Sequence, residues 1–234
     1  MRPPIPPELP ATAGLWPRTA AWCADALLLA MPTALISAAL PVVRDARLLQ
    51  HWRALGEAMG WQMQRSIRQG DDFLGYMRDV WAADGLVRAH VENFHHALLQ
   101  GLGIPLLIFI LLGLLYWPLL ESGRKHATLG KRWVGLQVRA GHAPLGLGRA
   151  FKRHLAGGLS WLTLNIGHLL IATGEHRALH DRIADTYVVW RPNAAQRTPW
   201  WGWLLIALVM ALPWLLAVLA GAQLSAAMAA SLAA

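Results

Sequence analysis

Four long apolar stretches limit what this chain can fold into. They are residues 18–40, 97–120, 155–173 and 203–221. Each has close to the roughly 20 residues that a helix needs to cross a bilayer. The second and fourth stretches carry no charged residue, whereas the first carries Arg18 and Asp25. We therefore predict an all-α membrane protein with three to four membrane helices.

The composition supports a membrane protein over a soluble one. Hydrophobic residues make up 56% of the 234 positions and charged residues only 15%, which is a membrane composition. Many of the 13 tryptophans flank the apolar stretches, as in an interfacial aromatic belt. The net charge of +8 comes largely from one loop beside these stretches, so we expect the lipid bilayer as a partner and no nucleic acid. We expect residues 18–40 to be a retained anchor behind the Pro-rich, cytoplasmic residues 1–17, because this stretch is longer than a signal-peptide core and contains an acid.

One segment between the second and third stretches is strongly basic. Its eight basic residues are Arg124, Lys125, Lys131, Arg132, Arg139, Arg149, Lys152 and Arg153. The accompanying acid is Glu121 alone. Basic loops remain on the cytoplasmic side, so we expect a multi-pass protein of the bacterial inner membrane with a cytoplasmic N-terminus.

Residues 44–96 are polar and have a helical pattern. Apolar side chains recur on one helix face, at Leu48, Trp52, Leu55, Met59, Met63 and Ile67. The sequence "QGDD" at 69–72 then supplies a stop followed by capping residues. We predict a long antiparallel helical hairpin on the periplasmic side, with seven Arg balanced by seven acids. Its role is left open between a solvated stalk and an arm that docks a partner.

Two short segments alternate as strands do. They are residues 132–146 and 185–191. If they pair as a short cytoplasmic β-hairpin-like element, both lie on one side of the membrane, and a full crossing by residues 155–173 would separate them. We therefore favour a re-entrant or interfacial segment there over a fourth span. The side of the C-terminus depends on that choice.

Placing Asp25 within an apolar stretch costs free energy. An acid at the centre of a membrane helix costs about 2.5–3.5 kcal/mol on insertion scales, so Asp25 needs a partner, a proton or water. Arg18 is seven residues away, too far along one helix for a direct ion pair. The functional interpretation is an intramembrane proton or cation group, and the structural one is an Asp that locks helix packing.

Residues 175–186, "EHRALHDRIADT", concentrate opposite charges after the third stretch. His176 and His180 have the spacing of two metal ligands on a helix, but no third ligand accompanies them, so we expect no metal and no cofactor. No nucleophile accompanies the His–Asp pair, and we expect no enzyme. Asp181 and Arg182 instead complement Arg18 and Asp25. The "ATLGKRW" sequence at 127–133 lacks the spacing of a phosphate-binding loop.

Four ordered motifs resemble the RDD domain of bacterial membrane proteins. They are "AGLWPRTAAWCADALLL", "TLGKRWVGLQV", "RAFKR" and "RALHDRIADTYVV". The resemblance covers residues 13–40 and about 100–191. We expect the RDD-like membrane domain itself to extend over residues 18–191. It implies that the Arg of the family name is Arg18, that the first Asp is Asp25 and that the second is Asp181, with Asp185 as the alternative. Residues 44–96 are then an enlarged connection, and 192–234 are a C-terminal helix and tail beyond the domain.

The resemblance implies a role in transport of ions or small ligands. In that role Asp25 would be the intramembrane proton or cation group. Its charge network would consist of Arg18, Asp181, Arg182, Asp185, His180 and the relay residue His168. The competing expectation is an accessory or assembly subunit of an inner-membrane complex. The partner would be a second copy of the chain or another membrane protein.

Overall fold

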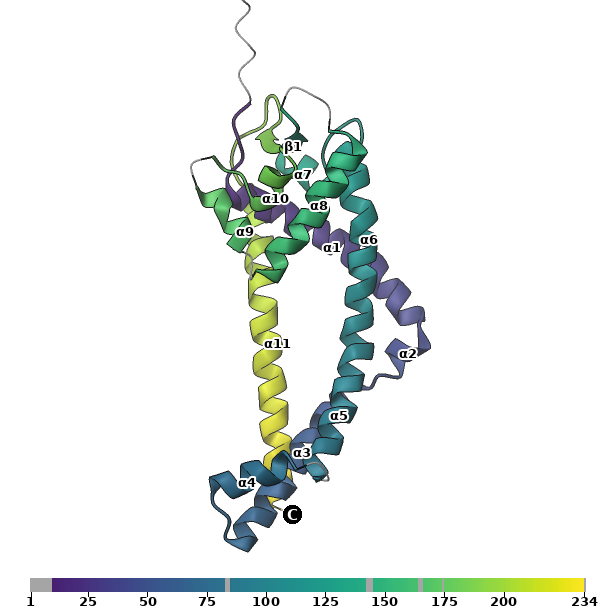
Figure 1. The fold of residues 1–234 in the computed structure, drawn as a ribbon, viewed down its shortest axis with the longest axis vertical. Coiled ribbons are helices and arrows are strands. Elements are labelled where there is room, and N and C mark those ends of the chain that lie inside the picture. The colour runs from purple at the N-terminus through teal and green to yellow at the C-terminus, as the bar shows by residue number, and fades with distance from the viewer. Residues whose placement is uncertain (1–9, 83–84, 142–144, 164–165, 174, 234) are drawn as a thin grey trace, which may run out of the picture. The chain divides into compact units, whose positions relative to one another are not determined.

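The computed structural model describes residues 10–82, 85–141, 145–163, 166–173 and 175–233 (Figure 1). Its elements up to the second membrane helix are α1 (Leu15–Ala39), α2 (Pro41–Arg44), α3 (Leu48–Gln69), α4 (Phe73–Val80), α5 (Leu86–Leu98), the π-helix η1 (Leu99–Gly103) and α6 (Ile104–Ser122). The later elements are α7 (Leu129–Val134), β1 (Leu136–Arg139), α8 (Leu147–Leu162), α9 (Ile166–Leu169), the 3-10 helix η2 (Leu170–Ala172), α10 (Leu179–Ile183), β2 (Tyr187–Trp190) and α11 (Trp200–Ala233). The predicted all-α membrane fold with a small β element is confirmed.

Three helices in the described part of the chain are long and apolar enough to cross a membrane. They are α1, the continuous helix Leu86–Ser122 formed by α5, η1 and α6, and α11. The stretch 155–173 is divided between the end of α8, α9 and η2, and residues 164–165 lie outside the described residues. None of these short pieces is long enough to cross alone.

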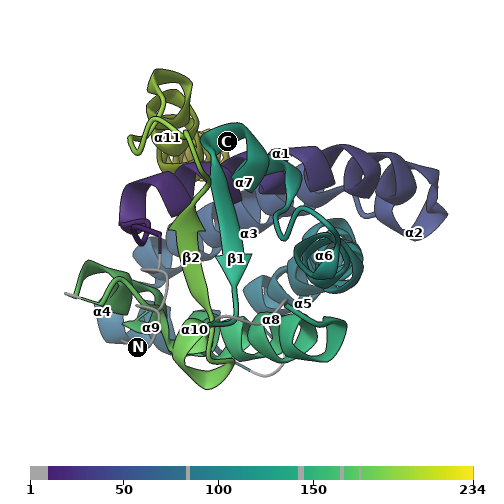
Figure 2. The ribbon, with the colours of Figure 1, turned by 90° about the horizontal axis from the view of Figure 1, so that it is seen from above.

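The described residues within 1–31 and 110–209 form one compact unit, unit 1. In it β1 and β2 pair antiparallel with Leu136 opposite Trp190, which confirms the predicted strand pairing (Figure 2). The N-terminal segment extends this sheet, because Ala13 N donates to Val188 O at 2.9 Å. Small buried side chains on α1, such as Ala20, allow close packing against this core and against α11.

The described residues within 32–109 and 210–234 form the second compact unit, unit 2. In it α3 packs against α5 around Leu55 and Val87, so the expected helical hairpin is present. The second arm is divided, with α4 as a separate short helix, because Asp72 caps α4 and Gly85 precedes α5. One feature differs from the prediction, because the last helix continues past residue 221 to Ala233.

The extended end of α11 has a packing reason within unit 2. A Cβ at Gly60 would lie 2.6 Å from Met228 O, and one at Gly56 would lie 2.9 Å from Leu224 O. A helix face with glycines four residues apart lets two backbones approach closely. Trp52 Nε1 also donates to Ala220 O at 2.8 Å. The hairpin is therefore tied to the C-terminal helix, and its α3 face is not wholly solvated.

Candidate functional site: two buried clusters around the first helix

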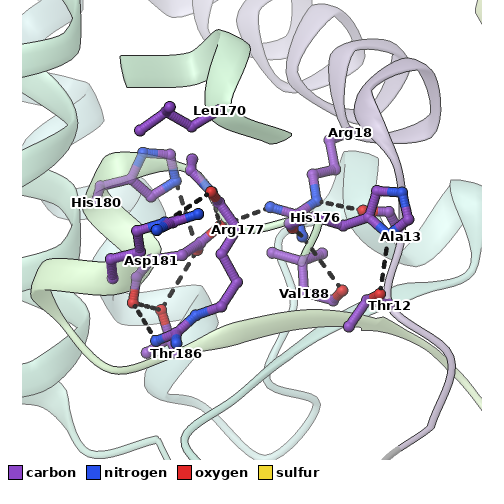
Figure 3. Close-up of polar contacts among 12 residues, drawn as sticks. Thr12, Ala13, Arg18, Leu170, His176, Arg177, His180, Asp181, Thr186 and Val188 are labelled. Carbon is purple, nitrogen blue, oxygen red and sulfur yellow. Dashed lines mark hydrogen bonds and ion pairs between the residues drawn. The ribbon is translucent and has the colours of Figure 1, made fainter. Parts of the chain in front are cut away.

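Asp181 is at the centre of a buried ion-pair network in unit 1. Arg18 Nη1 contacts Asp181 Oδ2 at 2.6 Å, and Arg153 Nη2 contacts Asp181 Oδ1 at 3.0 Å. Asp181 is fully buried, and Oδ2 also accepts from Ala178 N at 3.1 Å. Figure 3 shows the side chains of Arg18 and Asp181 with their polar contacts. The predicted pairing of Arg18 with Asp181 is therefore confirmed.

The network continues to a residue that sequence reasoning did not select. Glu121, at the end of α6, is buried and accepts from Arg153 Nη1 at 2.8 Å and from Lys131 Nζ at 3.0 Å. The order of contacts is Arg18, Asp181, Arg153, Glu121 and Lys131. The sequence contains a signal for this role of Glu121, because it is the lone acid beside eight basic residues.

The basic segment is divided between buried and exposed side chains. Lys131 and Arg153 are buried and ion-paired, whereas Arg124, Lys125 and Lys152 are exposed. Arg132 is partly buried, and its Nε donates to Ala127 O at 2.9 Å. Only part of the positive charge that marks membrane topology therefore faces solvent.

The electrostatics of the network fix its charges at neutral pH. Burial opposes ionisation of Asp181, but Arg153 and Arg18 outweigh it and hold the pKa of that carboxyl well below its usual range. Burial likewise opposes the charge of Arg153, yet Glu121 and Asp181 raise the pKa of its guanidinium. Two anions therefore lie between three cations, and opposite charges at contact distance favour the charged forms.

Asp25 belongs to a second cluster with different partners. Its Oδ1 accepts from Tyr116 OH at 2.7 Å and from Gly130 N at 2.6 Å, and its Oδ2 accepts from Thr128 Oγ1 at 2.5 Å. Asp25 is fully buried. Neutral donors thus supply the partner that its burial requires.

Local sequence explains why α7 can hold this carboxylate. Thr128 is the N-cap of α7, and its hydroxyl accepts from Lys131 N at 3.3 Å while donating to Asp25. Gly130 brings the backbone against α1, because a Cβ there would lie 2.2 Å from Ala21 O. The "TLGK" residues therefore form a carboxylate-binding helix start.

The expected pairing of Asp25 with Arg182 is wrong. Arg182 Nη2 lies 3.5 Å from Glu175 Oε2, and both side chains are exposed. The two are separated in space because Asp25 lies deeper in α1 than Arg18, where α7 supplies its partners. Of residues 181 and 182, only Asp181 therefore pairs with a charge on α1, that of Arg18.

The remaining predicted site residues lie around the Asp181 network. Asp185 pairs with Arg177 at 3.2 Å, but its side chain is 72% exposed, so Asp181 is the buried acid of the two. The rings of His168 and His180 lie 5.3 Å apart, and His180 Nε2 lies 3.2 Å from Arg153 Nη2. Among the described residues, no group of three or more His, Cys, Asp or Glu is placed to hold a metal ion.

An apolar groove lies beside α1 but does not reach Asp25. It has a volume of about 630 Å³, and its lining includes Leu27, Met31, Trp133 and Trp201. Asp25 is not part of that lining. The groove is thus suited to apolar contacts and gives no polar route to the carboxylate.

Comparison with known proteins extends the resemblance found in the motifs. The model of the RDD family matches residues 12–185, well over half of the chain. The chain belongs to the RDD family. The matched range contains Arg18, Asp25 and Asp181, and also the inserted arm.

The RDD-family chain also resembles one curated protein. This is "Uncharacterized protein YxaI" of Bacillus subtilis (strain 168), which is 37% identical over 87 residues. The matched region is 37% of this chain and 58% of the relative, so the chain spans less than two thirds of that protein's length. No solved structure matches the chain significantly.

His180 predicts a pH dependence of stability. Burial, followed by the charge of Arg153, lowers its pKa to about 3, whereas an unfolded histidine titrates near 6.5. Between these values the unfolded state binds a proton that the folded state does not, so stability falls as the pH falls. We expect the free energy of unfolding to decrease by up to about 1.4 kcal/mol per pH unit below about pH 6.5.

Thermal melts in detergent between pH 7.5 and 5 would measure this dependence. His180→Gln should flatten the slope, because glutamine does not titrate. The control is His96→Gln, at an exposed position of α5, which should keep the wild-type slope. An unchanged slope in His180→Gln would contradict the assignment.

Proposed function

We propose that this RDD-family protein is a non-catalytic accessory or assembly subunit of a bacterial inner-membrane complex, docking a membrane-protein partner through its periplasmic helical arm. The observation that carries the proposal is the exposed apolar surface where α3 ends and α4 begins. Ile67, Phe73 and Leu74 are there 65%, 72% and 73% exposed. Large apolar side chains exposed close together in sequence on an extramembrane segment favour an interaction site.

The three membrane helices support a consistent topology for this role. Unit 1 gathers the N-terminal segment with residues 123–199, and unit 2 gathers the arm with the end of α11. With three crossings, the N-terminal segment and residues 123–199 lie on one side of the bilayer, and the arm and the end of α11 lie on the other. The exposed cations Arg124, Lys125 and Lys152 favour the cytoplasm for the first set, which leaves the arm and the C-terminus in the periplasm.

The two buried clusters fit a structural role in such a subunit. Asp25 accepts hydrogen bonds from a hydroxyl on α6, a hydroxyl preceding α7 and a backbone N–H of α7. A site built from donors holds a carboxylate, whereas a cation would require acceptor oxygens turned toward it. The clusters therefore fasten α1 to α6, α7 and α10 and leave partner binding to the exposed surfaces.

Transport of a small ion or solute, coupled to protons at Asp25, is the second candidate. It is favoured by the position of an ionisable residue within a membrane helix, next to the hydroxyls of Tyr116 and Thr128. Such residues are common in proton relays. The small number of membrane helices makes a homo-oligomer necessary for this role.

Two measurements separate the candidates. Cross-linking and co-purification in native nanodiscs should retain a membrane partner with wild type and lose it about tenfold in the Phe73→Ser/Leu74→Ser variant. The matched control is Arg53→Ser/Glu57→Ser, at exposed polar positions of α3, which should keep the partner. Equal recovery from the two variants would contradict docking through the arm. Proton-coupled cation flux in proteoliposomes of the protein alone would instead support the carrier.

A further inference from the structure

A groove lies in unit 2 where α1 ends and the second membrane helix begins. Its volume is about 490 Å³, and it is lined by α2, the start of α3 and the π-helix η1. Gly101 of η1 forms part of the lining, and a Cβ there would meet Ala46 Cβ at 3.4 Å. The segment before α3 therefore packs directly on the π-helix, a feature frequent at functional sites.

Two arginines line this groove without a protein counter-charge. Arg44 and Arg47 are both exposed. Within the described part of the chain, neither has an ion-pair partner. Asp45 lies between them in sequence, so the segment keeps a net charge of +1. Guanidinium groups are well suited to bind phosphate oxygens in pairs.

The backbone at Arg47 is unusual for this residue type. Its φ is 45° and its ψ is 40°, in the left-handed region that favours glycine. Its side chain makes no capping hydrogen bond to α3. A glycine or asparagine would hold this turn with less strain, and the Arg47 side chain is left exposed beside the groove.

The segments that adjoin the groove in sequence carry exposed aliphatic side chains. Leu35 near the end of α1 is 69% exposed, and Leu102 in η1 is 56% exposed. Leu49, which lines the groove itself, is also exposed. Positive charge beside exposed aliphatic side chains at the end of a membrane helix matches a lipid headgroup with its acyl chains.

We propose that this groove binds an anionic phospholipid. The phosphate lies between Arg44 and Arg47, and the acyl chains run along the exposed leucines of α1 and η1. Free phosphate would use only the arginines, whereas a lipid also covers the apolar flanks. The net positive charge favours an anionic headgroup over a zwitterionic one. The site is independent of the proposed arm–partner interaction.

Binding of short-chain phosphatidylglycerol to the delipidated full-length protein, counted by native mass spectrometry, tests the proposal. We expect Arg44→Gln and Arg47→Gly each to weaken binding about fivefold, and the double variant about 25-fold. Arg53→Gln, at an exposed position of α3 outside the groove, should bind as wild type does.

Arg47→Gly separates binding from folding. Glycine adopts a positive φ readily, so this variant should melt at the wild-type temperature or above while its lipid affinity falls. Lipid affinity of the double variant within twofold of wild type would overturn the proposal. Inorganic phosphate or phosphatidylcholine binding as tightly as phosphatidylglycerol would overturn the assignment to an anionic lipid.

Discussion

Replacing Asp181 with asparagine is expected to reduce the free energy of unfolding by about 3–5 kcal/mol. The substitution removes the carboxylate between Arg18 and Arg153, whose side chains are about nine-tenths buried. Two cations would then face each other in a buried site with Glu121 alone for compensation. Breaking a buried pair on one side costs far more than the net contribution of the pair, because a charge is left desolvated. Chemical unfolding in detergent, or the yield of folded protein, measures the loss.

Asp185→Asn is the matched control, because Asp185 lies four residues later with an exposed side chain that pairs with Arg177. Exposed ion pairs contribute little, so this variant should stay within about 0.5 kcal/mol of wild type. Equal destabilisation by the two substitutions would show that the buried network does not hold the fold. A stable Asp181→Asn variant would contradict the structure of the network itself.

Gly130→Ala is expected to destabilise the protein by about 3–5 kcal/mol through steric exclusion and loss of hydrogen bonds. The added Cβ would lie 2.2 Å from Ala21 O and 2.8 Å from Asp25 Oδ1. Helix α7 would have to move away from α1, which removes the bonds that Gly130 N and Thr128 make to Asp25. Proteolytic resistance and the melting temperature in detergent would report the change.

Gly158→Ala, at another helical glycine, is expected to change the stability in the opposite direction. A Cβ at Gly158, in α8, would meet nothing within 4 Å, and alanine is the better helix former by about 1 kcal/mol. This variant should therefore be slightly more stable than wild type. If Gly130→Ala behaves in the same way, α7 does not pack against α1 as the structure places it.

Local sequence patterns predicted most of the secondary structure. Apolar length identified the membrane helices, because each must satisfy its backbone internally across the bilayer. The period of the apolar residues in 44–96 predicted α3, and alternation predicted β1 and β2. The end of α11 was missed because apolar length marks only the crossing, whereas residues 222–233 are Ala-rich and favour a helix. Their close approach to Gly56 and Gly60 gives this extension a packing partner.

The candidate site was predictable in part. The cost of burying Asp25 required a partner, but the sequence did not show which donors would reach it. Tyr116 and Thr128 are ordinary residues in their own segments, 91 and 103 positions from Asp25. Glu121 was visible as an isolated acid, yet its pairing with Arg153 depends on where α8 crosses the end of α6.

By itself, the sequence determined that this chain is a membrane protein of the RDD family with charged residues that cannot be left unpaired. These conclusions follow from apolar length, from desolvation cost and from ordered motifs, which are all local properties. Only the tertiary structure decided that Arg18 and Asp25 serve separate clusters. The reason is geometric, because two residues seven apart on α1 meet different elements, α10 for Arg18 and α7 for Asp25.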